Sequence, residues 1–182
     1  PPADASNLPP AQQVRVATFN VRKFFDTTCD TRNCSGNSFE RVPTESEFQA
    51  KAQQVANGMR VLESDILLLQ EFETEACLNA TLSYLEDEGY SVHVLGETGG
   101  NASLDVAVVS RGDLVGRRSH RDAQIPLPTS GTTTFSRDLL EVHIMVNGQR
   151  VIVFNAHFKA KTRDDPARRL AEASAARAIA LR

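Results

Sequence analysis

Alternating and continuous runs of apolar residues predict the strands of this chain. Residues 14–21 alternate between apolar and polar positions and are rich in β-branched side chains, the pattern of a half-buried strand. Residues 65–70 are almost entirely apolar, which favours a central strand buried on both faces. Two more strands are predicted at residues 90–95 and 104–110, on either side of a Gly-Gly turn.

Later in the chain, predicted strands at residues 139–146 and 150–156 flank Asn147-Gly148. Asn-Gly between two apolar runs is the strongest short signal for a β-hairpin, because both residues accept the positive φ angles of a tight turn. We therefore expect these two strands to pair with each other. Residues 22–43, in contrast, are polar and predict a long loop over the end of the first strand, and loops of that length tend to be functional.

Capping signals and apolar periodicity predict the helices. Thr44 and Glu47 form a capping box ahead of apolar residues at helical spacing, and this helix should end near Ser64. A second helix is predicted from a cap at Thr74 through Asp87.

The third predicted helix has Asp165 as its N-cap and Pro166 in its first position, with Leu170, Ala173 and Ile179 on its apolar side. The resulting order is β-α-β-α-β-β-β-β-α. This order indicates an α+β fold, with a mixed β-sheet that carries helices on one face.

Composition narrows the class of protein. The chain has 182 residues, of which 41% are hydrophobic, as in an ordinary soluble domain. Its net charge of −3 gives no global attraction to nucleic acid, so affinity for phosphate must come from a bound cation or from local basic stretches such as residues 111–121 and 159–169. For the first stretch, a solvated charged surface is the alternative. No segment approaches the roughly 20 apolar residues of a membrane span.

The N-terminus and the cysteines point to a cellular setting. Residues 1–13 are rich in Pro and Ala and predict an N-terminal spacer ahead of one domain, residues 14–182. Cys29 and Cys34 flank four polar residues of the long loop, a separation that permits a disulfide, although two free thiols are the alternative. A disulfide and such a spacer favour a secreted or periplasmic protein. Cys77 is then expected to be unpaired and buried on a helix.

Polar residues suited to metal or phosphate chemistry lie at the strand ends. Glu71 follows the buried strand at 65–70, and Asn20 ends the first strand. A hard cation such as Mg²⁺ prefers carboxylate oxygen, so Glu71 is the predicted metal ligand, and the Asn20 amide can accept from a metal-bound water or donate to a phosphate. A solvent-exposed glutamate and a turn-forming asparagine are the alternatives.

A guanidinium and an imidazole complete the candidate set. Arg137, in Phe-Ser-Arg-Asp, has the planar fork that suits phosphate oxygens, whereas ion pairing with a neighbouring carboxylate is its alternative. Asn155, His157 and Lys159 alternate along Phe-Asn-Ala-His-Phe-Lys, and period two places them on the same side of an extended segment. Asp105 is a candidate to orient the histidine, and an exposed strand-end carboxylate is equally consistent with its position.

The set and order of these segments resemble the endonuclease/exonuclease/phosphatase superfamily, which includes pancreatic-type deoxyribonuclease, apurinic endonucleases, neutral sphingomyelinases and inositol-polyphosphate phosphatases. The resemblance runs from about Val14 to the last residue. Phe-Ser-Arg is similar to the pancreatic-type nucleases, and Asn-Ala-His-Phe-Lys is similar to the secreted bacterial nucleases. Family members continue with Gly-Asp-x-Asn and Ser-Asp-His segments, neither of which occurs in this sequence.

This resemblance implies a fold larger than the chain. We expect the chain to be the N-terminal half of a four-layer α/β/β/α sandwich of the deoxyribonuclease-like type. The sheet face that carries residues such as Ile66, Val106 and Val153 is then expected to lack its cover, which a missing second sheet would supply.

The resemblance also implies a divalent-metal-dependent phosphodiester hydrolase, an endonuclease acting on DNA or RNA, that uses Mg²⁺ (or Mn²⁺ or Ca²⁺) at Glu71 and Asn20. His157, Asn155 and Arg137 are then the expected catalytic groups, and Lys159 joins Arg137 in binding substrate. The missing C-terminal half, on the same or another chain, would be needed for turnover. Two alternatives stay open: a phospholipid or phosphoinositide phosphatase or phosphodiesterase of the same superfamily, and a non-catalytic interaction module.

Overall fold

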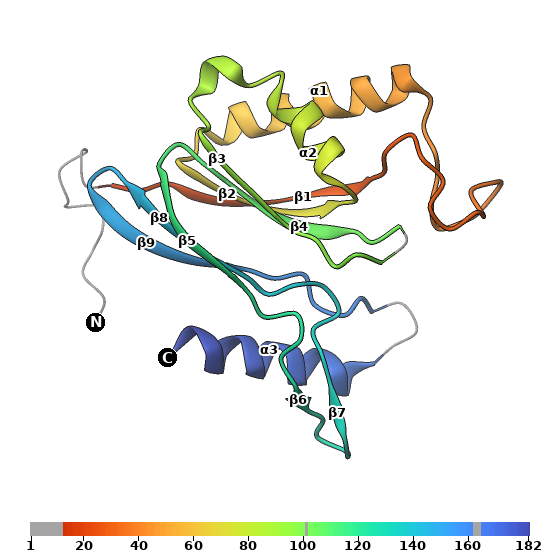
Figure 1. The fold of residues 1–182 in the computed structure, drawn as a ribbon, viewed down its shortest axis with the longest axis vertical. Helices are drawn as coiled ribbons and strands as arrows, with labels where there is room; N and C mark the ends of the chain where they lie inside the picture. Colours follow the sequence, from red (N-terminus) through yellow and green to blue (C-terminus); the bar gives the residue numbers. More distant parts are fainter. Residues whose placement is uncertain (1–12, 101, 162–164) are drawn as a thin grey trace.

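The computed structural model describes residues 13–100, 102–161 and 165–182, so the predicted spacer lies, except for its last residue, outside the described residues. Four layers lie on one another (Figure 1): a pair of helices, a first sheet, a second sheet and a C-terminal helix. The α+β class is as predicted, but the chain contains all four layers and not only the two that were expected of it.

The first sheet has four strands in the order β1-β2-β4-β3. Its strands are β1 (Val16–Phe24), β2 (Ile66–Phe72), β3 (Val92–Gly96) and β4 (Asp105–Ser110). β1 runs parallel to β2, whereas β4 pairs antiparallel with both β2 and β3, so the sheet is mixed. β2 and β4 are the central strands, which explains why their sequences are apolar on both faces.

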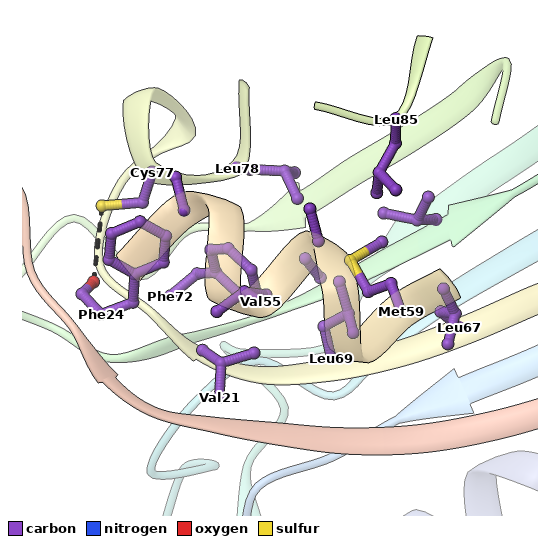
Figure 2. Close-up of a cluster of buried hydrophobic side chains, with 14 of the residues drawn as sticks. Val21, Phe24, Val55, Met59, Leu67, Leu69, Phe72, Cys77, Leu78 and Leu85 are labelled. Carbon is purple, nitrogen blue, oxygen red and sulfur yellow. Dashed lines mark hydrogen bonds between the residues drawn. The ribbon is translucent and has the colours of Figure 1, made fainter. Parts of the chain in front are cut away.

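Helices α1 (Glu45–Leu62) and α2 (Glu75–Leu82) cover the outer face of the first sheet. The predicted capping box begins α1: Thr44 accepts from the backbone N–H of Glu47, and the Glu47 side chain accepts from that of Thr44. Figure 2 shows the core between these helices and the sheet, with Met59 and Leu78 pointing inward. Cys77 is buried there, its thiol donates to the Phe24 carbonyl oxygen, and burial raises the pKa of the thiol to about 11.

The second sheet packs on the inner face of the first and has the order β5-β8-β9. Its strands are β5 (Asp113–Ser119), β8 (Leu140–Val146) and β9 (Gln149–Asn155). The predicted hairpin joins β8 to β9, and both Asn147 and Gly148 have positive φ angles. Helix α3 (Pro166–Ala180) covers the outer face, with Asp165 as its N-cap.

Short elements complete the description. They are the 3₁₀ helix η3 (Glu86–Glu88) and the two-residue strands β6 (Ile125–Pro126) and β7 (Thr132–Thr133), which pair with each other.

The prediction that one face of the sheet lacks its cover is wrong. The strands β8 and β9 do not extend the first sheet but form the second one, so the face expected to be bare is covered within this chain. Ile66, Val106 and Val153 lie in the apolar core between the two sheets. β5, for which no strand was predicted, is one of the two edge strands of this second sheet as described. The chain thus contributes to all four layers.

Two helix predictions also need correction. α2 ends at Leu82 rather than at Asp87, and η3 follows it before Gly89 takes a positive φ. The inner side of α3 holds Ala171 and Glu172, whereas Leu170 is 61% exposed. Glu172 is buried where Leu170 was expected, because α3 contacts polar loops as well as apolar side chains. Glu172 accepts hydrogen bonds from Ser136 and Lys159 in those loops.

Candidate functional site

Two irregularities of the first sheet lie side by side. The pairing register of β1 with β2 shifts between Asn20 and Phe24, and that of β2 with β4 shifts between Gln70 and Phe72. Glu71 sits in the second irregularity with φ 73°, a left-handed conformation that is uncommon for a glutamate. Bulges re-aim side chains, and strained backbone persists where function requires it. Both observations single out Glu71 before any chemistry is considered.

Neighbouring donors hold the carboxylate of Glu71. Asn20 Nδ2 donates to Oε1 (2.8 Å) and the backbone N–H of Lys23 donates to Oε2 (2.8 Å). Burial alone would raise the pKa of Glu71, but these two hydrogen bonds, together with nearby His157 and Arg137, bring it below its usual value. The carboxylate is therefore ionised and fixed in direction at neutral pH.

His157 faces this carboxylate from the segment after β9. Its Nε2 lies 3.7 Å from Glu71 Oε1, and its Nδ1 is buried and has no hydrogen-bond partner among the described residues. Burial lowers the pKa of His157, Arg137 lowers it further, and Glu71 and Glu172 oppose the change. The imidazole is consequently neutral at pH 7, with one ring nitrogen as donor and the other as acceptor.

Arg137 lies in the same electrostatic neighbourhood, since it affects the pKa of both Glu71 and His157. Its Nε donates to the Leu104 carbonyl oxygen (3.3 Å), which leaves the two terminal nitrogens of the guanidinium. Over the described part of the chain, it forms no ion pair with Asp138 or Glu141. Asp138 accepts from the backbone N–H of His120, and Glu141 is paired with His120 and His143.

The side chain of Asn155, a predicted catalytic group, is buried and held by hydrogen bonds. It is 2% exposed, its Nδ2 donates to the carbonyl oxygens of Leu69 and Ala107 (2.8 Å each), and its Oδ1 accepts from Gln70 Nε2 (2.9 Å). All three contacts cross from β9 in the second sheet to the first sheet. These contacts hold the start of the segment that carries His157.

Glu172 is a positioning residue that the sequence analysis missed. This fully buried carboxylate of α3 accepts from the backbone N–H and the hydroxyl of Ser136 (2.8 and 2.6 Å) and from the backbone N–H of Lys159 (2.6 Å). It thereby ties together the two segments that present Arg137 and His157. An acidic residue in the middle of an otherwise small, apolar helix face was the available signal. Lys159 itself is placed by its backbone, and none of its described contacts brings its side chain to Glu71.

Hydrogen bonds also fix Asn20 and Asp105. Asn20 Oδ1 accepts from the backbone N–H of Arg22 (2.8 Å), and its Nδ2 donates to Glu71, so the amide holds the carboxylate of the predicted metal ligand. Asp105 is fully buried and accepts from Thr98 and Ser103, so it neither orients His157 nor lies exposed at a strand end.

The long loop between β1 and α1 is fastened at two points. Cys29 and Cys34 form a disulfide, as expected. Glu40 is 1% exposed and accepts from the backbone N–H groups of Asp30 (2.6 Å) and Thr31 (2.8 Å) and from the Thr31 hydroxyl. Within the described residues, Cys29, Cys34 and Glu40 are the only group of three potential metal ligands, but disulfide sulfurs do not ligate metals as thiolates do.

The combined geometry can serve hydrolysis of a phosphate ester. A fixed, ionised carboxylate suits a hard cation with several waters, a neutral imidazole can donate to a phosphate oxygen, and a guanidinium can neutralise the phosphate charge.

None of the helices in the described residues has the length and apolar composition of a membrane span.

No protein-family model matches the chain, and no curated protein sequence matches it. Among solved structures, the beta hairpin deletion mutant of beta toxin from Staphylococcus aureus matches with a TM-score of 0.53 and 14% identity, over 91% of this chain and 57% of that one. A humanized TDP2 from D. rerio matches with a TM-score of 0.49 and 15% identity, over 81% of this chain and 51% of that one. An endonuclease/exonuclease/phosphatase family protein from Leptotrichia buccalis gives 0.45 and 14%, over 82% and 56%.

This chain spans about half the length of the solved structures it matches. At these identities the similarity concerns the fold, and the beta toxin match carries it. With its two facing sheets and outer helices, the chain shares its fold with about half of the beta toxin structure.

Proposed function

We propose that this chain carries part of the active site of a divalent-metal-dependent phosphodiester hydrolase that acts on nucleic acid. One observation supports the proposal most directly: the carboxylate of Glu71 and the imidazole of His157 come from different sheets, yet lie 3.7 Å apart beside a guanidinium. Packing of the two sheets does not by itself require a positive φ angle at Glu71. The strained backbone of this residue therefore supports a functional role.

Glu71 fits a hard divalent cation such as Mg²⁺, and equally Mn²⁺ or Ca²⁺. Mg²⁺ requires one or two protein carboxylates and keeps its waters, and Glu71 is ionised, oriented and partly exposed. A cation bound there would stabilise the negative charge that develops on the phosphate and the leaving oxygen. Asn20 and the Lys23 backbone N–H hold the carboxylate in the direction this requires.

The remaining groups bind and orient the phosphate. Because the pKa of His157 is lowered, its neutral ring acts as a hydrogen-bond donor to a phosphate oxygen rather than as a store of positive charge. Arg137 supplies that charge through its terminal nitrogens. In the resembled family, activation of the attacking water comes from the Asp-x-Asn and Asp-His segments. We therefore expect turnover only when such segments are present.

The test is cleavage of supercoiled plasmid by the complete protein. Glu71→Ala should abolish cleavage at every Mg²⁺ concentration, by at least about 100-fold, because removing a metal ligand removes electrostatic stabilisation of the transition state. Glu63→Ala is the matched control, since Glu63 is a solvent-exposed carboxylate in a surface ion pair. Near wild-type cleavage by the Glu71 variant would contradict the site assignment.

The same preparation separates the alternatives. Release of phosphate from phosphoinositide, without plasmid cleavage, would make the protein a phospholipid or phosphoinositide hydrolase. A non-catalytic interaction module would show neither activity and no Mg²⁺-linked rise in melting temperature.

We further propose that the protein is secreted or periplasmic. The Cys29–Cys34 disulfide supports this setting, since disulfides persist in oxidising compartments. Mass spectrometry of alkylated protein, isolated from its host without reductant, should show one modified cysteine, Cys77. Three modified cysteines would argue for a reducing compartment.

A further inference from the structure

A cavity of about 370 Å³ opens between β1, the disulfide-bearing loop and the start of α1. Lys23 contacts both the candidate site and the cavity. Its backbone N–H donates to Glu71, and its side chain lines the cavity. Lys51, on the opposite wall, is electrostatically linked to the site. Burial and nearby Arg22 lower the pKa of Lys51, whereas Glu71 raises it. The cavity is thus a continuation of the candidate site, and its volume falls within the range of small-ligand pockets.

One wall of the cavity is aromatic. Phe25 and Phe39 meet edge to face, with centroids 5.7 Å apart, and the Lys23 ammonium lies 4.4 Å from the Phe39 ring centroid. Phe25 and Phe48 are buried, but Phe39 is 55% exposed. A large apolar side chain left exposed next to a charged group offers a stacking surface for a flat ring.

The other feature of the cavity is its surplus of positive charge. Lys23, Arg41 and Lys51 line it, and over the described residues none of them forms an ion pair with a carboxylate, whereas Arg60 and Arg111 elsewhere both pair with Glu88. Lys51 donates to the Val21 carbonyl oxygen (2.7 Å), which uses one of its three N–H donors. The carboxylate of the lining, Glu47, is occupied by the capping box of α1.

The loop that forms the outer wall is preorganised. The Cys29–Cys34 disulfide and the three hydrogen bonds accepted by Glu40 hold residues 29–40 in place, immediately before Arg41. A ligand therefore meets Phe39 and Arg41 without having to order the loop first, which lowers the entropic cost of binding.

We propose that this cavity binds one nucleotide unit of single-stranded nucleic acid, with its base against Phe39 and a backbone phosphate at Lys23, Arg41 and Lys51. An aromatic platform joined to unpaired cations is the combination that single-stranded nucleic acid requires, because bases stack while cations follow the phosphates. A phospholipid would instead need an apolar channel for its chains, and this cavity is rimmed by cations. The position of this nucleotide next to the cleaved phosphate rests on the proposed function.

The test is binding of a fluorescein-labelled, 12-nucleotide single-stranded DNA to the full chain in EDTA, measured by fluorescence anisotropy. EDTA prevents cleavage and isolates the cavity from the metal site. Phe39→Ala should weaken binding by roughly 5- to 150-fold, the fold-change that corresponds to the loss of one base–aromatic stack. Arg41→Gln should weaken binding and reduce the slope of log affinity against log salt by about 0.7, as expected for one lost phosphate contact with a single strand.

Arg32→Gln is the matched control, since Arg32 is an exposed arginine of the same loop that does not line the cavity. Because Phe39 is 55% exposed, its replacement by alanine should lower the melting temperature only slightly, through the lost contacts with Phe25 and Lys23. Wild-type affinity in Phe39→Ala, or an equal loss in Arg32→Gln, would overturn the proposal. So would Phe39-dependent binding to anionic phospholipid vesicles combined with Phe39-independent binding of the oligonucleotide.

Hydrolysis of bis(4-nitrophenyl) phosphate by the complete protein separates this proposal from the proposed function. This small diester reports on the metal site alone. If Phe39-dependent DNA binding is found and the diester is not hydrolysed, the binding site stands and the hydrolase assignment fails. If the diester is hydrolysed but DNA binding does not depend on Phe39, the hydrolase assignment stands and the nucleotide site fails.

Discussion

Single residues of this chain show how backbone strain and electrostatics mark a site. Glu71 was predicted from its place after an apolar strand, and the structure adds the left-handed φ and the two donors that fix its carboxylate. Those donors could not be predicted, because Lys23 contributes its backbone and Asn20 turns its nitrogen inward. The burial of Glu73, two residues later, could not be predicted either: this residue is 3% exposed, and its Oε1 has no hydrogen-bond partner among the described residues.

Glu73 should make stability fall as pH rises. Burial raises its pKa from 4.5 to about 7, nearby Asp26, Glu40 and Asp30 add to this effect, and the hydrogen bond from the Asp26 backbone opposes it. A carboxyl group with a raised native pKa holds its proton in the native state while the unfolded chain has lost its own. The contribution of protonated Glu73 to the free energy of unfolding is therefore complete below about pH 4.5. It is lost as the pH rises through about 7.

The measurement is urea unfolding of wild type and Glu73→Gln at pH 5 and pH 8. The wild type should lose about 2–3 kcal/mol more than the variant between these values, since one pKa unit corresponds to about 1.4 kcal/mol. The glutamine stays neutral, so the difference between the proteins removes the contribution of all other titrating groups. Parallel pH profiles would show that Glu73 is ionised in the native protein.

At the scale of elements, local sequence patterns correctly predicted the features that depend only on neighbouring residues. The capping box of α1 and the Asn-Gly turn between β8 and β9 form as predicted, because their hydrogen bonds lie within a few residues. β5 was missed because its strand is exposed along most of its length, contains Gly116 and two arginines, and exists through pairing with β8. α2 was predicted too long because Leu85 has helical spacing and is buried, but the helix ends at Leu82 and Leu85 precedes η3.

The buried glutamate of α3 should couple this helix to both motif segments. Glu172→Ala leaves the donors of Ser136 and Lys159 without their acceptor and should cost about 3 kcal/mol in the free energy of unfolding, since hydrogen bonds to a charged group contribute about 1.5–3 kcal/mol each. Urea denaturation measures this loss, with the exposed Glu86→Ala as control.

A positioning role requires more than lost stability. In the complete protein, Glu172→Ala should also lower kcat for plasmid cleavage at a temperature where it is fully folded, while Glu172→Gln, which retains one acceptor oxygen, recovers part of that loss. A variant that is less stable but has unchanged kcat would limit Glu172 to the packing of α3.

At the scale of the molecule, the arrangement of two sheets was the part that periodicity could not resolve. Both faces of β2 and β4 are apolar, and the sequence alone did not distinguish a sheet covered by an absent partner from one covered by β8 and β9. Apolar packing and the side chain of Asn155 both join the sheets in the structure. The motif pattern singled out Asn155, but it could not show that the side chain is buried between the two sheets.

Asn155 should therefore behave as a structural link between the sheets. Asn155→Ala removes the donor to the buried carbonyl oxygens of Leu69 and Ala107 and one acceptor of the Gln70 amide, which should cost about 3 kcal/mol in the free energy of unfolding. Asn57→Ala, a change on the surface of α1, should cost less than about 1 kcal/mol. A catalytic Asn155 would give the opposite result: wild-type stability in urea with plasmid cleavage abolished. Because the link lies at the end of β9, its loss should also increase hydrogen exchange around His157 more than in α1, which directly connects the packing of the two sheets to the geometry of the site.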